Sequence, residues 1–426
     1  MPAIGAVDAS RMPFGERSRA CAEAPPAGVL RVPTYASVAG LPLLIDRCEL
    51  QPLVRDITSG FTKISTVVRL SGGPHVGEGE DITWDQVDQI ELLRGGGDLH
   101  WLHGERTLDG FASLLDQVNL FPKPPIRGSA RFYRRWAFES AALDLALRQN
   151  GLSLGQVVGR EARPVNFVAS IRLGEPPSLR ELHGLLRQNP GLRLKLDATP
   201  GWDDPFVAEL AALDRVDVID FKGAYRNLSV ATEPEPGLYR RVIEGLPDAW
   251  IEDPASTPSI DDLLERHRDR ISWDEPIHSI ADVERLPRRP GMLNIKPARF
   301  GSLRALLDTY DYCDAHGIGV YGGGMFEQGP GRGQLQYLAS LFHPSAPNDI
   351  APLEYNLQVA PIHLPQAPLA PDPAPTGFRW GIYDRRRSVR EPAGPATYED
   401  CPWPPAAPSC SSPTSAATRA TSGPTG

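Results

Sequence analysis

"AWIEDP" (residues 249–254) is a short apolar run that ends in two adjacent carboxylates and a proline. "ISWDEP" (residues 271–276) has the same design, and residues 216–223 and 292–301 also end apolar runs in a charged residue. One such pair of acids is typical of an exposed loop. Their repetition after helix-sized gaps instead indicates buried strands whose ends line one site.

Eight apolar, β-rich runs follow Pro164 and alternate with helical patterns. This alternation is the sequence form of repeated βα units around a parallel sheet. The runs are residues 165–173, 192–198, 216–223, 248–254, 270–276, 292–301, 317–327 and 349–356. Eight such units close into a TIM-type (β/α)8 barrel, whose active site lies at the carboxyl ends of the strands. We therefore predict an α/β fold.

The chain of 426 residues is long enough for two domains. We expect an α+β domain with a linking helix at residues 36–163 and the barrel at residues 164–365. Residues 1–35 and 366–426 are rich in Pro, Ala, Ser and Thr, a composition that buries too little apolar surface to offset the entropy of ordering. Both ends are predicted to be mostly disordered. Residues 374–383 ("APTGFRWGIY"), with three aromatics, are an expected ordered exception.

The composition argues against several classes of protein. A formal net charge of −9 does not suit nucleic-acid binding, which needs a basic face. The five cysteines lie far apart without a CxxC pair, so neither a disulfide framework nor a zinc cluster is indicated. No run approaches the roughly 20 apolar residues of a membrane span, and the N-terminus lacks the apolar core of a signal peptide. A cytoplasmic protein is expected.

One charged residue stands at the end of each run from the second to the sixth. These residues are Lys195, Asp220, Glu252, Asp274 and Lys296, with successive separations of 25, 32, 22 and 22 residues. Each separation is about one βα repeat. Adjacent parallel strands would bring the five side chains together around one cavity.

Three carboxylates in a dry cavity repel one another unless a cation neutralises them. An all-oxygen site suits a hard divalent ion, with Mg²⁺ the usual choice and Mn²⁺ an alternative. Lys195 and Lys296 would flank that ion. The arrangement suits removal of a proton beside a carboxylate, because the metal stabilises the enediolate while a lysine of lowered pKa takes the proton.

These residues resemble the enolase superfamily, in its muconate-lactonising-enzyme-like branch. The resemblance covers about residues 40–360 and rests on "RLK" (193–195), "IDFKG" (219–223), "IEDP" (251–254), "WDEP" (273–276) and "NIKPARFG" (294–301). It implies a capping domain before the barrel, a Mg²⁺ ion held by Asp220, Glu252 and Asp274, and Lys195 and Lys296 as acid and base. It also favours a homo-oligomer.

The chain departs from the family's pattern at two positions. Arg193 stands where the first of two paired lysines is common, and Lys222 adds a cation two residues after Asp220. "KLDATPGW" also resembles the family's third-strand motif, which would make Asp197 a metal ligand. If Asp197 ended the third strand, the single run at residues 165–173 would have to supply both earlier strands. Counting strands therefore favours Asp220 as the ligand. Asp197 is then a neighbour on the same strand face as Lys195.

Further candidates for substrate binding come from two loops. Glu327, in "YGGGMFEQGPGRG", is a candidate to touch substrate or a lysine at the seventh strand end. Ser59 and Lys63, in "SGFTK", resemble the loop with which the capping domain closes over substrate; a surface turn is the simpler alternative. Arg193, Lys222 and Asp197 complete this set.

Three reactions share the proposed first step: racemisation or epimerisation, dehydration, and cycloisomerisation. The expected partner is a small carboxylate substrate, and neither nucleic acid nor a membrane is expected. One alternative is an inactive barrel that retains the metal site as a binding or regulatory protein, prompted by Arg193 and Lys222. Another is a metal-free hydrolase that uses Glu252 and Asp274 as acid and base.

Overall fold

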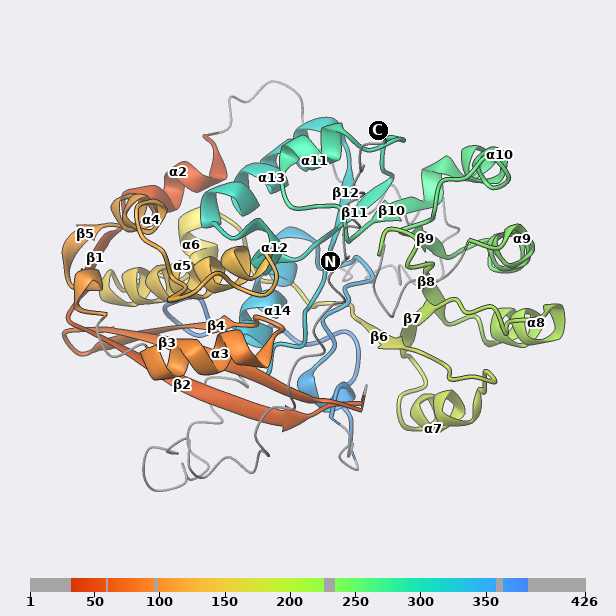
Figure 1. The fold of residues 1–426 in the computed structure, drawn as a ribbon, viewed down its shortest axis with the longest axis horizontal. Coiled ribbons are helices and arrows are strands. Elements are labelled where there is room, and N and C mark those ends of the chain that lie inside the picture. Colours follow the sequence, from red (N-terminus) through yellow and green to blue (C-terminus); the bar gives the residue numbers. More distant parts are fainter. Residues whose placement is uncertain (1–31, 59, 96–98, 226–233, 358–362, 382–426) are drawn as a thin grey trace, which may run out of the picture. The chain divides into compact units, whose positions relative to one another are not determined.

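The structure is a computed structural model that describes residues 32–58, 60–95, 99–225, 234–357 and 363–381. It contains an N-terminal antiparallel sheet with helices, followed by a parallel sheet whose strands alternate with helices (Figure 1). The predicted α/β barrel with a preceding α+β domain is confirmed. Among the described residues, no helix is both long and apolar enough to cross a membrane.

The N-terminal domain is built on a three-stranded sheet in the order β2-β3-β4, which is covered by the long helix α5. These elements are β2 (Arg47–Asp56), β3 (Thr62–Gly72), β4 (His75–Asp81) and α5 (Ala130–Gln149). Gly77 and Gly79 of β4 lie against α5, where an added Cβ would clash with the helix backbone. α5 ends as predicted before Gly151, whose φ of 66° lies in the left-handed region that favours glycine.

The remaining elements of this domain surround that sheet. They are α2 (Thr34–Ala39), β1 (Pro42–Ile45), α3 (Gln86–Gly95), η2 (His100–Leu102), β5 (Gly104–Thr107), α4 (Leu108–Asp116) and α6 (Leu154–Val158). β1 and β5 pair as a second, two-stranded antiparallel sheet.

The parallel sheet has the strand order β12-β11-β10-β9-β8-β7-β6, so every strand pairs with its neighbour in the chain. The strands are β6 (Val168–Ile171), β7 (Arg193–Asp197), β8 (Val216–Asp220), β9 (Trp250–Glu252), β10 (Ile271–Trp273), β11 (Met292–Ile295) and β12 (Gly319–Gly322). Between and after them lie α7 (Arg180–Gln188), α8 (Asp204–Leu213), α9 (Pro236–Gly245), α10 (Asp261–Arg266), η3 (Arg268–Arg270), α11 (Ile280–Glu284), α12 (Pro297–Phe300), α13 (Leu303–His316), α14 (Pro330–Phe342) and η4 (Leu353–Tyr355).

The eighth predicted run closes the ring without forming a named strand. Asn348 forms a parallel bridge with Phe167 beside β6, and Asp349 forms one with Gly323 beside β12. Prolines at 347 and 352 bracket this segment, and proline cannot donate a hydrogen bond to a ladder. The eighth segment therefore joins the two ends of the sheet through isolated bridges and nearby hydrogen bonds.

The inward face of the barrel has two layers. Val218, Trp250, Met292, Tyr321 and Ala346 form a separate buried apolar cluster. Val218 and Trp250 precede Asp220 and Glu252 by two residues, and side chains two apart in a strand share a face. An apolar layer therefore lies immediately below the charged strand ends, as expected for a packed barrel interior.

Residues beyond 365 also pack into the structure. Phe378 and Trp380 are buried, and Arg379 Nε donates to Asp144 in α5 at 2.6 Å. Leu369 pairs with Val165 at the start of the barrel. The segment expected to be an ordered exception in the tail contacts α5 through Arg379 and contacts Tyr337 of α14 through Phe378.

Candidate active site

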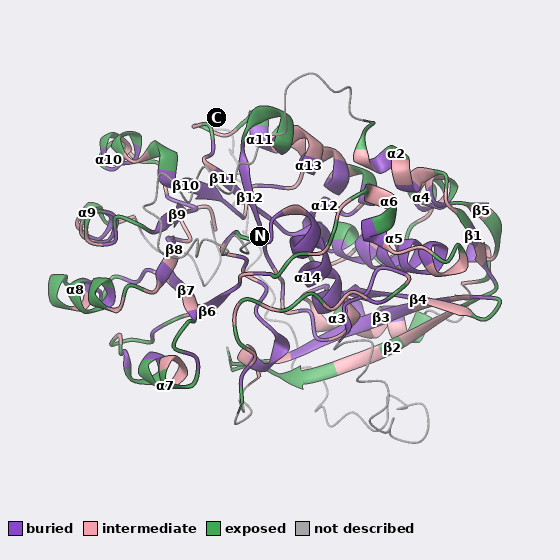
Figure 2. Ribbon diagram, turned by 180° about the vertical axis from the view of Figure 1, so that it is seen from behind, coloured by how far each residue is buried: buried purple, intermediate pink, exposed green. Residues whose placement is uncertain are grey.

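The five residues predicted at strand ends lie on five neighbouring strands, β7 to β11. Lys195 lies within β7, Asp220 and Glu252 are the last residues of β8 and β9, and Asp274 and Lys296 directly follow β10 and β11. All five side chains are buried, as are most residues of these strands in Figure 2. The strands of the two lysines therefore flank the three strands that supply carboxylates.

The ammonium group of Lys195 forms ion pairs with three carboxylates. Its Nζ lies 2.7 Å from Glu252 Oε1, 3.1 Å from Asp349 Oδ2 and 3.6 Å from Asp220 Oδ2. Burial alone would lower the pKa of Lys195, but these carboxylates outweigh it and raise that pKa well above its ordinary value. The lowered pKa is expected of a lysine in the metal-bound site, so it stays a prediction for Lys195. A metal cation bound to the same carboxylates would instead lower the pKa of Lys195.

Asp274 is held by cations from the neighbouring strand end. Lys296 Nζ lies 2.8 Å from its Oδ2, and Arg299 Nη1 donates to its Oδ1 at 2.8 Å. The Tyr225 hydroxyl donates to Oδ2 at 3.0 Å. Burial opposes ionisation, but Arg299 and Lys296 outweigh it and hold the pKa of Asp274 well below its ordinary range. Asp274 is therefore a carboxylate here.

Asp220 is bound mainly by Lys222. The backbone N–H of Lys222 donates to Asp220 Oδ1 at 2.9 Å, and its ammonium group contacts Asp220 Oδ2. The same ammonium lies 3.5 Å from Asp197 Oδ1. Burial raises the pKa of Asp220, but Lys222 and Lys195 reverse this shift and lower it. The two residues assigned to substrate binding, Lys222 and Asp197, thus lie beside the predicted ligand Asp220.

The second acid of "IEDP" has a different role from the first. Asp253 accepts backbone hydrogen bonds from Asp274 at 2.8 Å and from Glu275 at 2.9 Å. It therefore ties the end of β9 to the end of β10. Burial, with Asp274 and Asp220 nearby, raises the pKa of Asp253 well above its ordinary value.

This cluster carries more negative than positive groups. Within the described residues in contact here, six carboxylates face four cations, an excess of two negative charges if all are ionised. The carboxylates are Asp197, Asp220, Glu252, Asp253, Asp274 and Asp349, and the cations are Lys195, Lys222, Lys296 and Arg299. The raised pKa of Asp253 reduces this excess in the metal-free protein, and a bound cation would balance the remainder.

Two buried oxygens in the cluster lack partners. Glu252 Oε2 and Asn294 Oδ1 accept no hydrogen bond from any described residue. Burial, opposed by Lys195 and reinforced by Asp220, raises the pKa of Glu252 to about 7. An unpartnered oxygen beside uncompensated charge is what a hard divalent cation would bind. The donor chemistry therefore fits Mg²⁺.

The donors are nevertheless not arranged as a metal site. Among the described residues, no group of three or more His, Cys, Asp or Glu side chains is placed to hold a metal ion. Asp220, Glu252 and Asp274 each face a lysine of this chain instead. Metal binding to all three would require these side chains to turn from the ammonium groups.

Arg193 does not reach the cluster, which corrects its assignment to substrate binding. Its Nη2 lies 2.6 Å from Asp217 Oδ1, at the opposite end of β7 from Asp197. The β7–β8 pairing has an irregularity between Leu194 and Lys195. The extra residue of this irregularity is Asp217 of β8, because Leu194 pairs with Val216 and Lys195 with Val218. Arg193 is the first residue of β7, so its guanidinium binds Asp217 at the amino end of the strands and not the cluster at their carboxyl ends.

The other loop candidates lie in the N-terminal domain or after β12. Both carboxylate oxygens of Glu327 accept from Met325 N, and Arg332 lies 3.8 Å away. Lys63 is buried in β3, where its Nζ donates to Ile82 O at 2.8 Å and burial lowers its pKa to about 8. Neither is placed against Lys195 or Lys296 by these contacts. Ser59 lies outside the described residues.

Backbone strain gathers at the same strand ends. Of the four described non-glycine residues with positive φ, Lys222, Asp253 and Phe326 follow strands β8, β9 and β12, with φ of 52°, 45° and 63°. The fourth, Asp214, ends helix α8. Residues in this conformation are uncommon and concentrate at functional sites.

Sequence reasoning missed several members of the cluster. Asp349 opens the eighth run, but only closure of the barrel places it beside Lys195. Arg299 was visible in "IKPARFG", where it lies three residues after Lys296 and reaches Asp274 from helix α12. Tyr225 lies beyond β8 and gave no pattern of its own.

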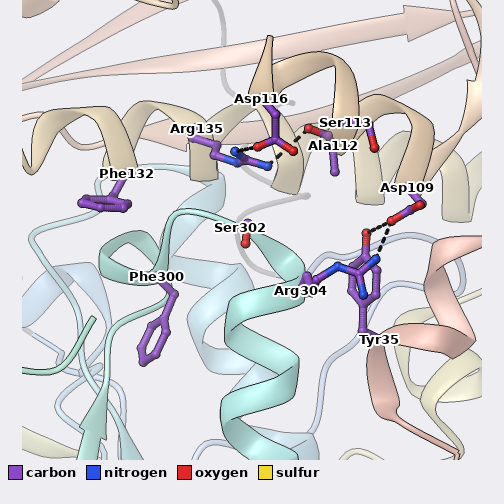
Figure 3. Close-up of a pocket in the computed structure, with 10 residues that line it drawn as sticks. All are labelled: Tyr35, Asp109, Ala112, Ser113, Asp116, Phe132, Arg135, Phe300, Ser302 and Arg304. Atoms are coloured by element: carbon purple, nitrogen blue, oxygen red, sulfur yellow. Dashed lines mark hydrogen bonds and ion pairs between the residues drawn. The ribbon is translucent and has the colours of Figure 1, made fainter. Parts of the chain in front are cut away.

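One cavity borders the cluster, and another lies elsewhere. A cavity of about 720 Å³ is lined by the segments after β8, β9 and β10, including Lys222, Tyr225 and Trp273. The pocket in Figure 3, of about 370 Å³, lies between α4, α5 and the start of α13. There Arg304 and Tyr35 both bind Asp109, at 2.8 and 2.9 Å. None of the five charged strand-end residues lines this pocket, so it is not the candidate site.

Comparison with known proteins matches both halves of the chain. Residues 36–157 match the model of the DUF8230 N-terminal domain and residues 161–357 that of its C-terminal domain, both described as domains of unknown function. The chain is 33% identical over 224 residues to an N-succinylamino acid racemase from Amycolatopsis, and 29% identical over 224 residues to an o-succinylbenzoate synthase from Bacillus subtilis.

Solved structures of the enolase superfamily share its fold. A dipeptide epimerase from Enterococcus faecalis has a TM-score of 0.61 at 18% identity, covering 79% of this chain and 99% of that one. Muconate lactonizing enzyme from Pseudomonas putida has a TM-score of 0.55 at 19% identity, covering 80% and 98%.

The chain has the fold of the enolase superfamily and is a divergent relative of the racemase and the synthase. The resemblance to the muconate-lactonising-enzyme-like branch is thereby confirmed. The matches to the racemase and the synthase cover 50% of this chain and 58% and 57% of those relatives. The chain thus spans little more than half the length of these two relatives.

Proposed function

We propose that the protein is a Mg²⁺-dependent enzyme that removes the α-proton of a small carboxylate substrate. The observation that carries the proposal is the order of charged residues around the barrel. Three carboxylates on β8, β9 and β10 are flanked by Lys195 on β7 and Lys296 after β11. In a ring closed by an eighth segment, β7 and β11 are four positions apart and so lie on opposite sides.

Asp220, Glu252 and Asp274 are the residues that would hold the metal. When bound, Mg²⁺ would supply Lewis-acid stabilisation of the negative charge that develops on the substrate carboxylate. The excess negative charge of the cluster and the unpartnered Glu252 Oε2 support this assignment. A dipeptide epimerase from Methylococcus capsulatus, solved with a Mg ion, has the same fold, with a TM-score of 0.54 at 22% identity.

Lys195 and Lys296 are the proposed acid and base. Each Nζ already lies within 2.8 Å of a carboxylate oxygen, of Glu252 or Asp274 respectively. Each ammonium group therefore lies beside one of the proposed metal ligands. A substrate α-carbon between them would meet one lysine on each face, which permits removal of a proton from one face and return to the other.

The proposed reactions are racemisation or epimerisation, dehydration and cycloisomerisation. Relatives named as a racemase, a synthase and an epimerase support an isomerase or a lyase. We propose N-succinylated amino acids as the first carboxylates to test, because two matched relatives are named for that substrate.

The test is exchange of the α-proton with solvent deuterium, followed by NMR for a panel of N-succinyl amino acids and other carboxylates. We expect exchange with Mg²⁺ and its loss on chelation. Lys296→Ala should lower the rate at least about a hundredfold, the range of general acid–base catalysis. Lys123→Ala, which removes an exposed lysine paired with Glu91, is the matched control. Exchange that survives chelation would contradict the proposal.

A second candidate is a binding or regulatory protein built on the same barrel. The contacts of Lys222 with Asp220 and Asp197 favour it, because they neutralise carboxylates with a side chain of the chain itself. This candidate predicts that carboxylates bind, as measured by calorimetry, while none of them exchanges its α-proton.

A further inference from the structure

Lys222 is the most exposed of the three lysines of the cluster. It lies two residues beyond the end of β8, with a φ of 52°. Its side chain is 15% exposed, whereas the side chains of Lys195 and Lys296 are 2% and 9% exposed. The strained backbone holds the base of the side chain beside Asp220, while the chain itself keeps access to solvent.

Lys222 engages both oxygens of Asp220. Its backbone N–H binds Oδ1 and its ammonium binds Oδ2, where Lys195 Nζ also lies 3.6 Å away. A divalent ion that binds Asp220 would approach these same oxygens. The ammonium and the metal are both cations and would repel each other at this distance. Metal binding therefore requires the ammonium of Lys222 to move away from Oδ2.

The neighbouring cavity gives this ammonium somewhere to go. Lys222, Tyr225 and Thr257 line the cavity of about 720 Å³ next to the cluster. The Tyr225 ring centroid is 5.1 Å from Lys222 Nζ, within the range of a cation–π contact. Lysine has a flexible four-carbon side chain with a mobile point charge. Arg299, by contrast, is fixed by the Asp274 carbonyl and carboxylate.

We propose that Lys222 is an internal counter-ion of Asp220 that couples metal binding to the binding of an anionic group of the substrate in the adjacent cavity. Without an anion, the ammonium stays on Asp220 and weakens metal binding. An anion in the cavity draws the ammonium away and frees Asp220 for the metal. Because coupling between two ligands is reciprocal, the metal strengthens anion binding by the same factor. The inference rests on the proposed metal site.

The test is isothermal titration of Mg²⁺ into the full-length protein, with and without succinate as a simple dicarboxylate probe. In the wild type, succinate should tighten Mg²⁺ binding at least about fivefold, the lower end of typical couplings. Lys222→Asn removes the ammonium and keeps a residue that tolerates positive φ. This variant should bind Mg²⁺ about tenfold more tightly without succinate and should lose the coupling.

Two controls separate this role from a general effect of charge. Lys222→Arg keeps the cation and should retain the coupling. Lys123→Asn removes an equal charge at an exposed site, where Lys123 pairs with Glu91, and should leave Mg²⁺ affinity unchanged. Thermal unfolding of each variant checks that it is folded.

The outcomes distinguish the inference from the function on which it rests. Mg²⁺ binding that is independent of succinate in the wild type overturns the coupling, even if Lys222→Asn does not fold. Mg²⁺ binding by Lys222→Asn that is equal to or weaker than that of the wild type also overturns the coupling. In that case, loss of Mg²⁺ binding in Asp220→Asn would still support the proposed metal site. If no Mg²⁺ binds to any of these proteins, the metal site and the coupling both fail.

Discussion

Lys195 and Glu252 form a fully buried ion pair in which Nζ lies 2.7 Å from Oε1, while Oε2 of the same carboxylate accepts no hydrogen bond from any described residue. A buried carboxylate with one free oxygen is costly unless a proton or a second cation compensates it. Burial raises the pKa of Glu252 from 4.5 to about 7, which favours the proton when no metal is present. The stability of the metal-free protein should therefore depend on the charge of this residue.

Because the folded state binds this proton more tightly than the unfolded state, Glu252 contributes stability that is full below about pH 4.5 and is lost as pH rises through about 7. The free energy of unfolding of the metal-free protein should fall across that window by up to about 3 kcal/mol relative to Glu252→Gln. Urea titrations of both proteins at several pH values measure this difference. A difference that is constant with pH would contradict the assignment.

Arg193 should be unnecessary for the chemistry, because Asp217 and the Asp214 carbonyl bind its guanidinium away from the cluster. Arg193→Ala should lower the free energy of unfolding by about 1–3 kcal/mol, because the pair with Asp217 is mostly buried, with side chains 14% and 18% exposed. The KM and kcat for any substrate found should stay within about threefold of wild type. A large rise in KM with unchanged stability would instead place Arg193 at the substrate.

Arg134 and Asp81 form a buried ion pair in the N-terminal domain, with side chains 0% exposed and a distance of 2.8 Å. Asp81→Asn would leave the guanidinium buried without its counter-charge, so we expect a loss of about 3–5 kcal/mol in the free energy of unfolding. Glu49→Gln, which breaks the exposed pair of Glu49 with Arg47, should change it by less than about 1 kcal/mol. Equal effects of the two changes would contradict the structure.

Phe378 tests whether the segment beyond residue 365 stabilises the fold. Its side chain is buried, and its ring packs against Trp136 of α5 and Tyr337 of α14. Phe378→Ala should cost about 3–5 kcal/mol, as for other buried phenylalanines. Phe132→Ala, at a ring that is 44% exposed, is the matched control and should cost much less. Denaturant unfolding of the two variants gives the comparison.

The sequence was most informative where charge and periodicity agreed. Apolar runs at regular intervals predict the barrel, and the charged residues that end those runs predict which side chains meet. Asp220, Glu252 and Asp274 follow directly from this pattern. The different role of Asp253 could not be read from the sequence. Only the structure shows that its carboxylate accepts hydrogen bonds from the backbone after β10.

The remaining errors have local causes. Arg193 follows the alternation expected of a strand, but it begins β7, so its guanidinium binds Asp217 at the amino end of the strands and lies away from the charged carboxyl ends. Asp349 could not be placed because it depends on closure of the ring by isolated bridges. The side-chain direction of Lys222 also depends on a positive φ, which nothing in its sequence neighbourhood predicts.

The most direct test of the central claim is a crystal structure of the protein with Mg²⁺ and an N-succinyl amino acid. We expect one ion bound by Asp220, Glu252 and Asp274 together, with Lys195 and Lys296 on opposite sides of the substrate α-carbon. An ion bound elsewhere, or a substrate whose α-carbon lies beyond the reach of both lysines, would contradict the account.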